Sequence, residues 1–141
     1  MLVAGPEQQV RRLFLGADGS VAVDFAPRRK GSPGQVSLRL YRYGDAIPLS
    51  SRLPILENMG FKAIEETTYD VIPQGKRAVI HDVALKAATD NADVKGAAAA
   101  LEATFMAVWS GAAENDAFNA LTLEQRLHWR DIALLRSFAR Y

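Results

Sequence analysis

Apolar residues, with one histidine among them, recur at every second position in three stretches of the chain. This alternation is the pattern of half-buried β-strands. The stretches are 21–25, 35–43 and 77–85. Their shared faces carry Val21, Val23 and Phe25 in the first, Val36, Leu38 and Leu40 in the second, and Val79, His81, Val83 and Leu85 in the third. Because Ala78, Ile80 and Ala84 occupy the other side of 77–85, we expect both faces of that strand to be at least partly covered.

Turn residues mark the connections around the first strand. Asp18-Gly19 predicts a tight hairpin between 10–15 and 21–25. The prolines, glycines and charges of 26–34 predict a mobile loop before the strand at 35–43.

A helix is expected after Gly44-Asp45 ends the second strand. Its predicted features are Ser50 or Ser51 as N-cap, Leu53 and Leu56 facing inward, and Gly60 as its C-terminal stop. The run 61–72 is again extended in pattern, and 73–75 supplies turn chemistry. We therefore expect 61–72 and 77–85 to pair as an antiparallel hairpin.

The pattern changes to a helical period from about Val94. A second helix is expected to open at a capping box formed by Thr122 and Gln125. Its inward stripe is predicted to be Leu127, Leu134, Phe138 and Tyr141. Because the sequence stops within this amphipathic pattern, we expect the chain to be a fragment of a larger enzyme that carries no active site of its own.

Composition narrows the class of protein. The chain has 141 residues, of which 49% are hydrophobic and 23% charged, as in an ordinary globular domain. A net charge of +1 argues against a nucleic-acid surface, and no window is apolar enough for a membrane span. The absence of cysteine excludes disulfides, thiolate zinc sites and cysteine nucleophiles, and it is typical of a cytoplasmic protein.

The sequence places no set of candidate catalytic side chains where they could act together. His81 and Asp82 are strand neighbours and should point to opposite faces, as should Glu65 and Glu66. His128 lies beside Trp129, and a packing or surface role is favoured for it. Glu114 and Asp116 are expected to cap or contact the next helix, and Trp109 and Trp129 to pack between helices. We predict no catalytic, cofactor-binding or metal-binding residue in this chain.

Several motifs in order over 35–141 resemble the large bacterial NAD-specific glutamate dehydrogenases. The motifs are 48–61 (PLSSRLPILENMGF), 80–82 (IHD), 107–121 (AVWSGAAENDAFNAL), Trp129-Arg130, Leu134-Leu135-Arg136 and Ala139-Arg140-Tyr141. The resemblance implies a very long polypeptide that uses NAD to deaminate L-glutamate oxidatively to 2-oxoglutarate and ammonia. It also implies that the catalytic part lies downstream of these motifs.

The resemblance further implies an α+β fold, in which a ferredoxin-like, ACT-like antiparallel sheet with helices is followed by a C-terminal helical extension. The order strand, helix, strand, strand, helix fits that module, but its last strand is missing. The module is therefore incomplete or permuted, with the 10–25 hairpin as a candidate replacement. We expect a hairpin and loop over 1–34, an ACT-like core over 35–93 and a helical segment over 94–141.

Three functions remain open. The first is a non-catalytic regulatory or assembly segment of the dehydrogenase, with NAD as cofactor of the parent enzyme only. The second is an amino-acid-sensing module, whose effector loop would include Tyr43, Gly44, Asp45 and Ile47. The third is a protein-interaction module. The expected partners are the remainder of the same polypeptide, an amino-acid effector and further copies in a homo-oligomer of the parent, without nucleic acid or membrane.

Overall fold

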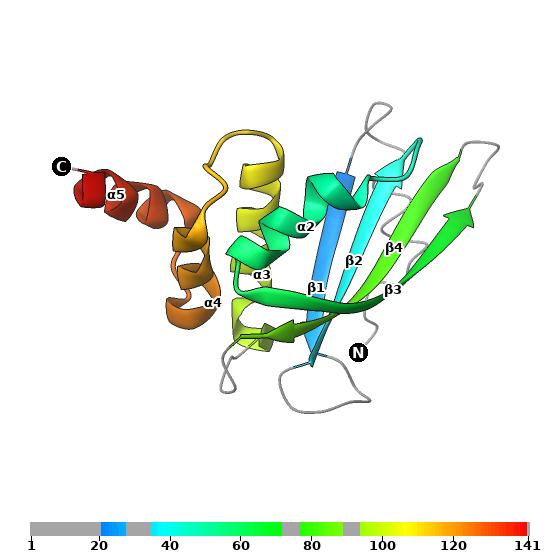
Figure 1. Cartoon of the computed structure of the whole chain (residues 1–141), viewed down its shortest axis with the longest axis horizontal. Helices are drawn as coiled ribbons and strands as arrows, with labels where there is room; N and C mark the ends of the chain where they lie inside the picture. Colours follow the sequence, from blue (N-terminus) through cyan, green and yellow to red (C-terminus); the bar gives the residue numbers. More distant parts are fainter. Residues whose placement is uncertain (1–20, 28–34, 72–76, 89–93, 141) are drawn as a thin grey trace.

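Four segments with alternating burial form one antiparallel sheet in the order β1-β2-β4-β3 (Figure 1). The strands are β1 (Val21–Pro27), β2 (Gln35–Tyr43), β3 (Phe61–Val71) and β4 (Ala78–Ala87). The computed structural model describes residues 21–27, 35–71, 77–88 and 94–140. The predicted strand 10–15, most of the loop 26–34 and the turn 73–75 lie outside the described residues.

Two helices cover one face of this sheet, called here the helix-covered face (Figure 1). Helix α2 (Leu49–Asn58) packs against β3, and α3 (Val94–Trp109) packs against β1. Between sheet and helices lies the main core, whose members include Phe25, Val36, Leu38, Leu40, Leu56, Met59, Leu85, Leu101 and Phe105. Apart from 10–15, the predicted strands, their faces and the β3–β4 hairpin are thereby confirmed.

Strand β1 supplies the strand that the sequence pattern lacked after α3. In a ferredoxin-like module the first and third strands lie in the middle of the sheet, and the last strand lies beside the first. Here β2 and β4 are central, and β1 pairs along its whole length with β2. The fold is thus ACT-like α+β, with its last strand placed before the others in sequence. The proposed boundaries at 34 and 93 stay predictions.

A smaller apolar cluster lies on the opposite face of the sheet. It consists of Tyr41, Tyr43, Ala78 and Ile80, all of them buried. The expectation that both sides of β4 are covered is therefore confirmed at this end of the strand.

Helix α2 differs from its prediction at its N-terminus. Pro48, and neither Ser50 nor Ser51, is the N-cap, and no side chain caps the first turn. Leu56 faces inward as predicted, whereas Leu53 is only partly buried, and Arg52 and Ile55 complete the buried face. Gly60 follows the helix with φ +94°, a conformation that glycine adopts without strain, so the predicted stop is confirmed.

The predicted helix from Thr122 onwards is wrong in its start, its continuity and its buried face. The 3₁₀ turn η2 (Ala117–Ala120) leads into a short α4 (Leu121–Gln125), and the left-handed Arg126 (φ 56°) separates α4 from α5 (Trp129–Arg140). Thr122 does not cap, because its hydroxyl lies buried 2.9 Å from that of Thr104. Helix α5 buries Ile132 and Arg136, while Leu134 and Phe138 face solvent.

Candidate functional site

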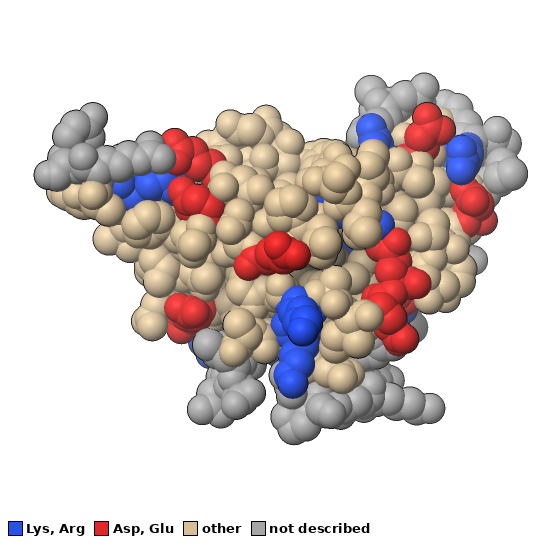
Figure 2. Space-filling view, in the orientation of Figure 1, with Lys and Arg blue, Asp and Glu red and all other residues tan. Residues whose placement is uncertain are grey.

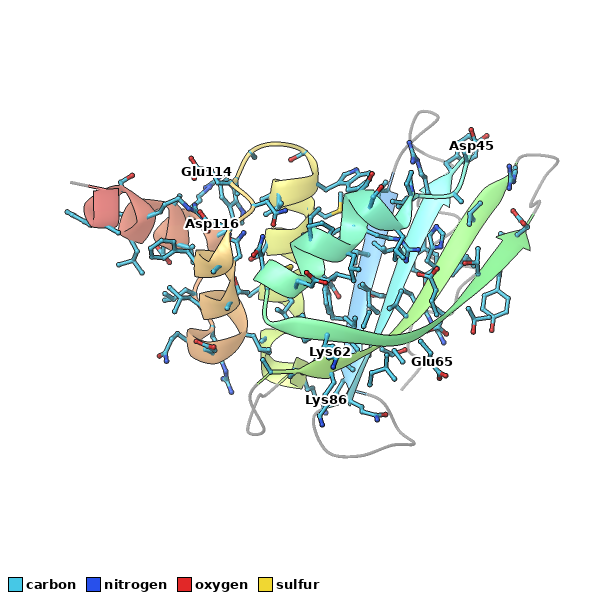
Figure 3. The ribbon with its side chains drawn as sticks, viewed as in Figure 1. Asp45, Lys62, Glu65, Lys86, Glu114 and Asp116 are labelled. Atoms are coloured by element: carbon cyan, nitrogen blue, oxygen red, sulfur yellow. The ribbon has the colours of Figure 1, made fainter. Side chains whose placement is uncertain are left out.

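The predicted effector loop leaves β2 at Gly44, whose φ of 111° turns the chain toward α2. The structure does not bring its four predicted residues together. Tyr43 belongs to the cluster on the face away from the helices, whereas Ile47 is buried in the main core. Asp45 is exposed at the tip, where Figure 3 shows it at the end of the sheet.

A buried histidine anchors this loop to the sheet. His81 of β4 lies on the helix-covered face, and its Nε2 accepts the backbone N–H of Ile47 at 3.0 Å. Because Nε2 is an acceptor, Nδ1 carries the proton of the neutral ring and faces the Thr68 hydroxyl at 3.2 Å. Both ring nitrogens are therefore engaged in holding the loop and the neighbouring strand.

An ion pair between a buried arginine and a partly exposed glutamate lies beside this histidine. Arg52 of α2 donates through Nη1 to Glu66 Oε1 and through Nη2 to Glu66 Oε2 (2.7 Å). The guanidinium side chain is only 4% exposed, and burial lowers its pKa. Glu66 Oε2 also lies 3.8 Å from His81 Nδ1. We call Ile47, Arg52, Glu66, Thr68 and His81 the His81 cluster.

A β-bulge in β3 aims two of these side chains. Ala63 pairs with Leu85 and Glu65 with Ala84, so Ile64 is an extra residue in the strand. Beyond the bulge, Glu66 faces the helix-covered side together with Phe61 and Ala63, and Glu65 faces the other side. The predicted divergence of Glu65 and Glu66 is confirmed, and the bulge decides which of them meets Arg52.

Burial keeps His81 neutral at physiological pH. Desolvation, together with the positive charge of Arg52 and against the smaller opposing effect of Asp70, lowers its pKa from 6.5 to about 4. His81 and Asp82 point to opposite faces as predicted, since Asp82 accepts from the Ser37 hydroxyl on the far side. Within the four described segments, no three His, Asp or Glu residues converge as metal ligands would.

An exposed ion-pair group surrounds the loop tip. Arg77 donates from Nη1 to Asp45 Oδ1 at 3.2 Å and from Nε to Asp70 Oδ1 at 3.0 Å. The carbonyl oxygen of Arg77 accepts the N–H of Gly44 at 2.9 Å. The arginine therefore joins the loop to the ends of β3 and β4 at the surface.

A second buried arginine organises the helical extension. Arg136 of α5 is 4% exposed and donates to Asp116 through Nε (2.5 Å) and Nη2 (2.7 Å), and to Asn119 Oδ1 (3.1 Å). Glu114 Oε2 lies 3.5 Å from Nε, and Figure 3 shows Glu114 and Asp116 between the end of α3 and α5. We call Glu114, Asp116, Asn119 and Arg136 the Arg136 cluster.

Two members of this second cluster were predicted from the sequence. Glu114 and Asp116 were expected to cap or contact the next helix, and Asp116 indeed accepts the N–H of Phe118 at 3.1 Å. Arg136 was not predicted, because its spacing from Asp116 gives no local signal. Trp109 stacks on Phe105 against the core, whereas Trp129 contacts its own neighbours His128 and Arg130.

The described residues include no helix with the length and apolar character needed to cross a membrane. Space-filling shows Lys, Arg, Asp and Glu interspersed with wide neutral areas on the helix-bearing side (Figure 2).

Two family models match the chain. Residues 20–98 match "Glutamate dehydrogenase, ACT3 domain", a range that includes β1 with the other three strands, and residues 113–141 match "Glutamate dehydrogenase, helical motif 3". A protein of Halomonas elongata named NAD-specific glutamate dehydrogenase is 38% identical over 95% of this chain. Proteins of the same name from Pseudomonas aeruginosa and Mycobacterium tuberculosis are 42% and 30% identical over 83% and 88% of it. The aligned region makes up only 7–8% of each relative's own length.

Proposed function

Because the chain belongs to the glutamate dehydrogenase family, with an ACT3 domain and a helical motif 3, we propose that it is a non-catalytic regulatory part of an NAD-dependent glutamate dehydrogenase. The parent enzyme would convert L-glutamate, NAD and water to 2-oxoglutarate, ammonia and NADH in the cytoplasm. The names of the relatives support this reaction, and the small share of their length that the chain spans supports a catalytic part elsewhere.

The contacts made by both ring nitrogens of His81 support the proposal that this part of the enzyme is non-catalytic. A general base needs a nitrogen that is free to take a proton from substrate. In His81, Nε2 accepts from the Ile47 amide and Nδ1 faces Thr68, so the ring positions the loop instead. A depressed pKa in a buried site is equally expected of a structural histidine.

Turnover assays with the two forms of the protein test this proposal. The full-length polypeptide should produce NADH from glutamate, and the 141-residue chain alone should not. In the full-length enzyme, His81→Gln should keep kcat within about tenfold, because general acid–base residues contribute on the order of a hundredfold or more. NADH formation by the short chain, or loss of turnover in a folded His81→Gln enzyme, would refute the non-catalytic role.

We also propose an amino-acid effector at the loop tip as the regulatory input. Arg77 presents a guanidinium to a ligand carboxylate, and Asp45 presents a carboxylate to its ammonium group. Exposed ion pairs contribute little stability, so a zwitterion could replace their mutual contact at small cost. The N-terminus of α2 lies in the same connection and favours a nearby anion.

Calorimetric titration of the chain with a panel of amino acids tests the effector site. Asp45→Asn should weaken binding of an amino acid at least tenfold, by removing the partner of its ammonium group. Asp131→Asn, a change at an exposed carboxylate on α5, should leave binding unchanged. Absence of heat with every amino acid, or equal effects of the two substitutions, would remove this effector proposal.

A further inference from the structure

Helix α5 exposes three large apolar side chains close together in sequence. Leu134, Leu135 and Phe138 are 59%, 42% and 70% exposed. Leu134 and Phe138 are four residues apart, and Leu135 and Phe138 three apart, so all three lie on the same side of the helix. Contiguous exposed apolar groups on a helix mark an interaction surface more often than scattered ones do.

The opposite side of α5 is fixed in place. Ile132 is fully buried, and the Arg136 guanidinium binds Asp116 and Asn119 of the preceding turn. Arg136 also lies 5.8 Å from the centre of the Phe118 ring, within cation–π distance. These contacts hold the helix in one rotational position, so its second apolar side cannot turn inward to the core of this chain.

The length of the relatives indicates what covers this side. Each aligned relative is a single polypeptide of which this region makes up 7–8%, so more than nine-tenths of such a polypeptide lies outside it. The family model over 113–141 is itself a helical motif, and α5 projects from the end of the molecule distant from the sheet (Figure 1). A surface there is accessible to another part of the same polypeptide without hindrance from β1–β4.

We propose that Leu134, Leu135 and Phe138 form a docking surface for an apolar groove in another region of the same glutamate dehydrogenase polypeptide. This inference rests on the proposed function, since it requires the long parent polypeptide. The three side chains would act as anchors of a helix-in-groove contact, with Phe138 about one turn after the two leucines. The contact would fix the ACT sheet relative to the remainder of the enzyme through the Arg136 cluster.

Photo-crosslinking in the full-length enzyme tests the docking surface. Phe138→p-benzoylphenylalanine places a reactive aromatic at the most exposed anchor. Ser137→p-benzoylphenylalanine places the same group on the preceding exposed residue, about 100° away around the helix. Position 138 should give cross-links within one polypeptide, to peptides outside these 141 residues, in at least fivefold higher yield than position 137. NADH formation by both labelled enzymes, measured in parallel, tests the proposed function separately.

Three results would overturn the docking proposal. Cross-links from position 138 that join two polypeptides would assign the surface to a second copy. Cross-links confined to residues of this chain would mean that the surface folds back on its own domain. Equal yields from 137 and 138 would mean that no specific groove is present.

Discussion

The two buried arginines serve two different regions of the molecule with similar chemistry. Arg52 belongs to the ACT region and Arg136 to the helical motif, and each is 4% exposed with a bidentate carboxylate partner. They differ in what surrounds the pair. Glu66 is the single carboxylate that Arg52 contacts among the described residues, whereas Arg136 also has Asn119 and Glu114 within reach.

Because of this difference, loss of one carboxylate should destabilise the His81 cluster more than the Arg136 cluster. A buried cation that loses its single anion retains the full desolvation penalty. A cation with two carboxylates and an amide nearby can redistribute its contacts. The His81 cluster also contains a titratable ring, which holds the loop through the Ile47 amide. The Arg136 cluster instead fixes the position of one helix, α5.

The largest expected effect is that of Glu66→Gln. This substitution leaves Arg52 buried without an anion, so we expect the free energy of unfolding to fall by about 3–5 kcal/mol. Urea denaturation of the chain and its variant measures the change. Glu65→Gln, on the exposed opposite side of the same strand, is the matched control and should change stability by less than about 0.5 kcal/mol. Equal effects of the two changes would contradict the assignment of Glu66 as the partner of the buried Arg52.

Acidification should destabilise the ACT region next most strongly. The folded pKa of His81, about 4, lies below its ordinary value of 6.5, so the unfolded state binds more protons between these values. The His81 contribution is therefore fully present above about pH 6.5 and is lost as pH falls toward about 4, to an extent on the order of 3 kcal/mol. Protonated Nε2 can no longer accept from Ile47. Urea midpoints across this range should fall in the native chain and fall less in His81→Gln; parallel curves would exclude His81 as the source.

Asp116→Asn should have a smaller effect than Glu66→Gln. Arg136 keeps Asn119 and Glu114, so we expect a loss of about 1.5–3 kcal/mol, the value of a hydrogen bond to a charged group. Adding Glu114→Gln should more than double the loss, because both carboxylates are then gone. A single-substitution loss as large as that of Glu66→Gln would show that the extra partners do not compensate.

The smallest expected effect is that of Phe138→Ser in the 141-residue chain. The side chain is mostly exposed, so stability should change by less than about 0.5 kcal/mol. Ile132→Ala, on the buried side of the same helix, should cost about 2–4 kcal/mol. Thermal or urea unfolding compares the two, and a larger loss from Phe138→Ser would place the buried face of α5 on the wrong side.

Local patterns were sufficient to predict the strands β1 to β4 and the end of α2. Alternation over 35–43 and 77–85 fixed the faces of β2 and β4, and Gly60 marked the end of α2. The place of β1 beside β2 was not determined by pattern, because it depends on a pairing between strands that a loop separates. The missing final strand indicated a module that was either incomplete or permuted, with the 10–25 hairpin as a candidate replacement.

The His81 and Arg136 clusters could not be predicted, because they depend on features that no local sequence pattern indicates. The bulge at Ile64 decides that Glu66 and not Glu65 faces Arg52, and no residue type at that position requires a bulge. In α5, apolar residues occur on both sides, so periodicity selected Leu134 and Phe138 as the buried stripe. The structure buries the other side because Arg136 finds a carboxylate at Asp116, a contact between residues that sequence spacing cannot pair.

Amide hydrogen exchange, measured residue by residue in Glu66→Gln and Asp116→Asn, tests the separation of the two clusters most directly. Glu66→Gln should speed exchange of the Ile47 amide at least tenfold and leave the amides of Ile132 to Arg136 unchanged, because His81 and Arg52 serve the loop and α2. Asp116→Asn should do the reverse. If either substitution speeds exchange in both regions equally, the two arginines stabilise one cooperative unit. The separation of the His81 cluster from the Arg136 cluster would then be wrong.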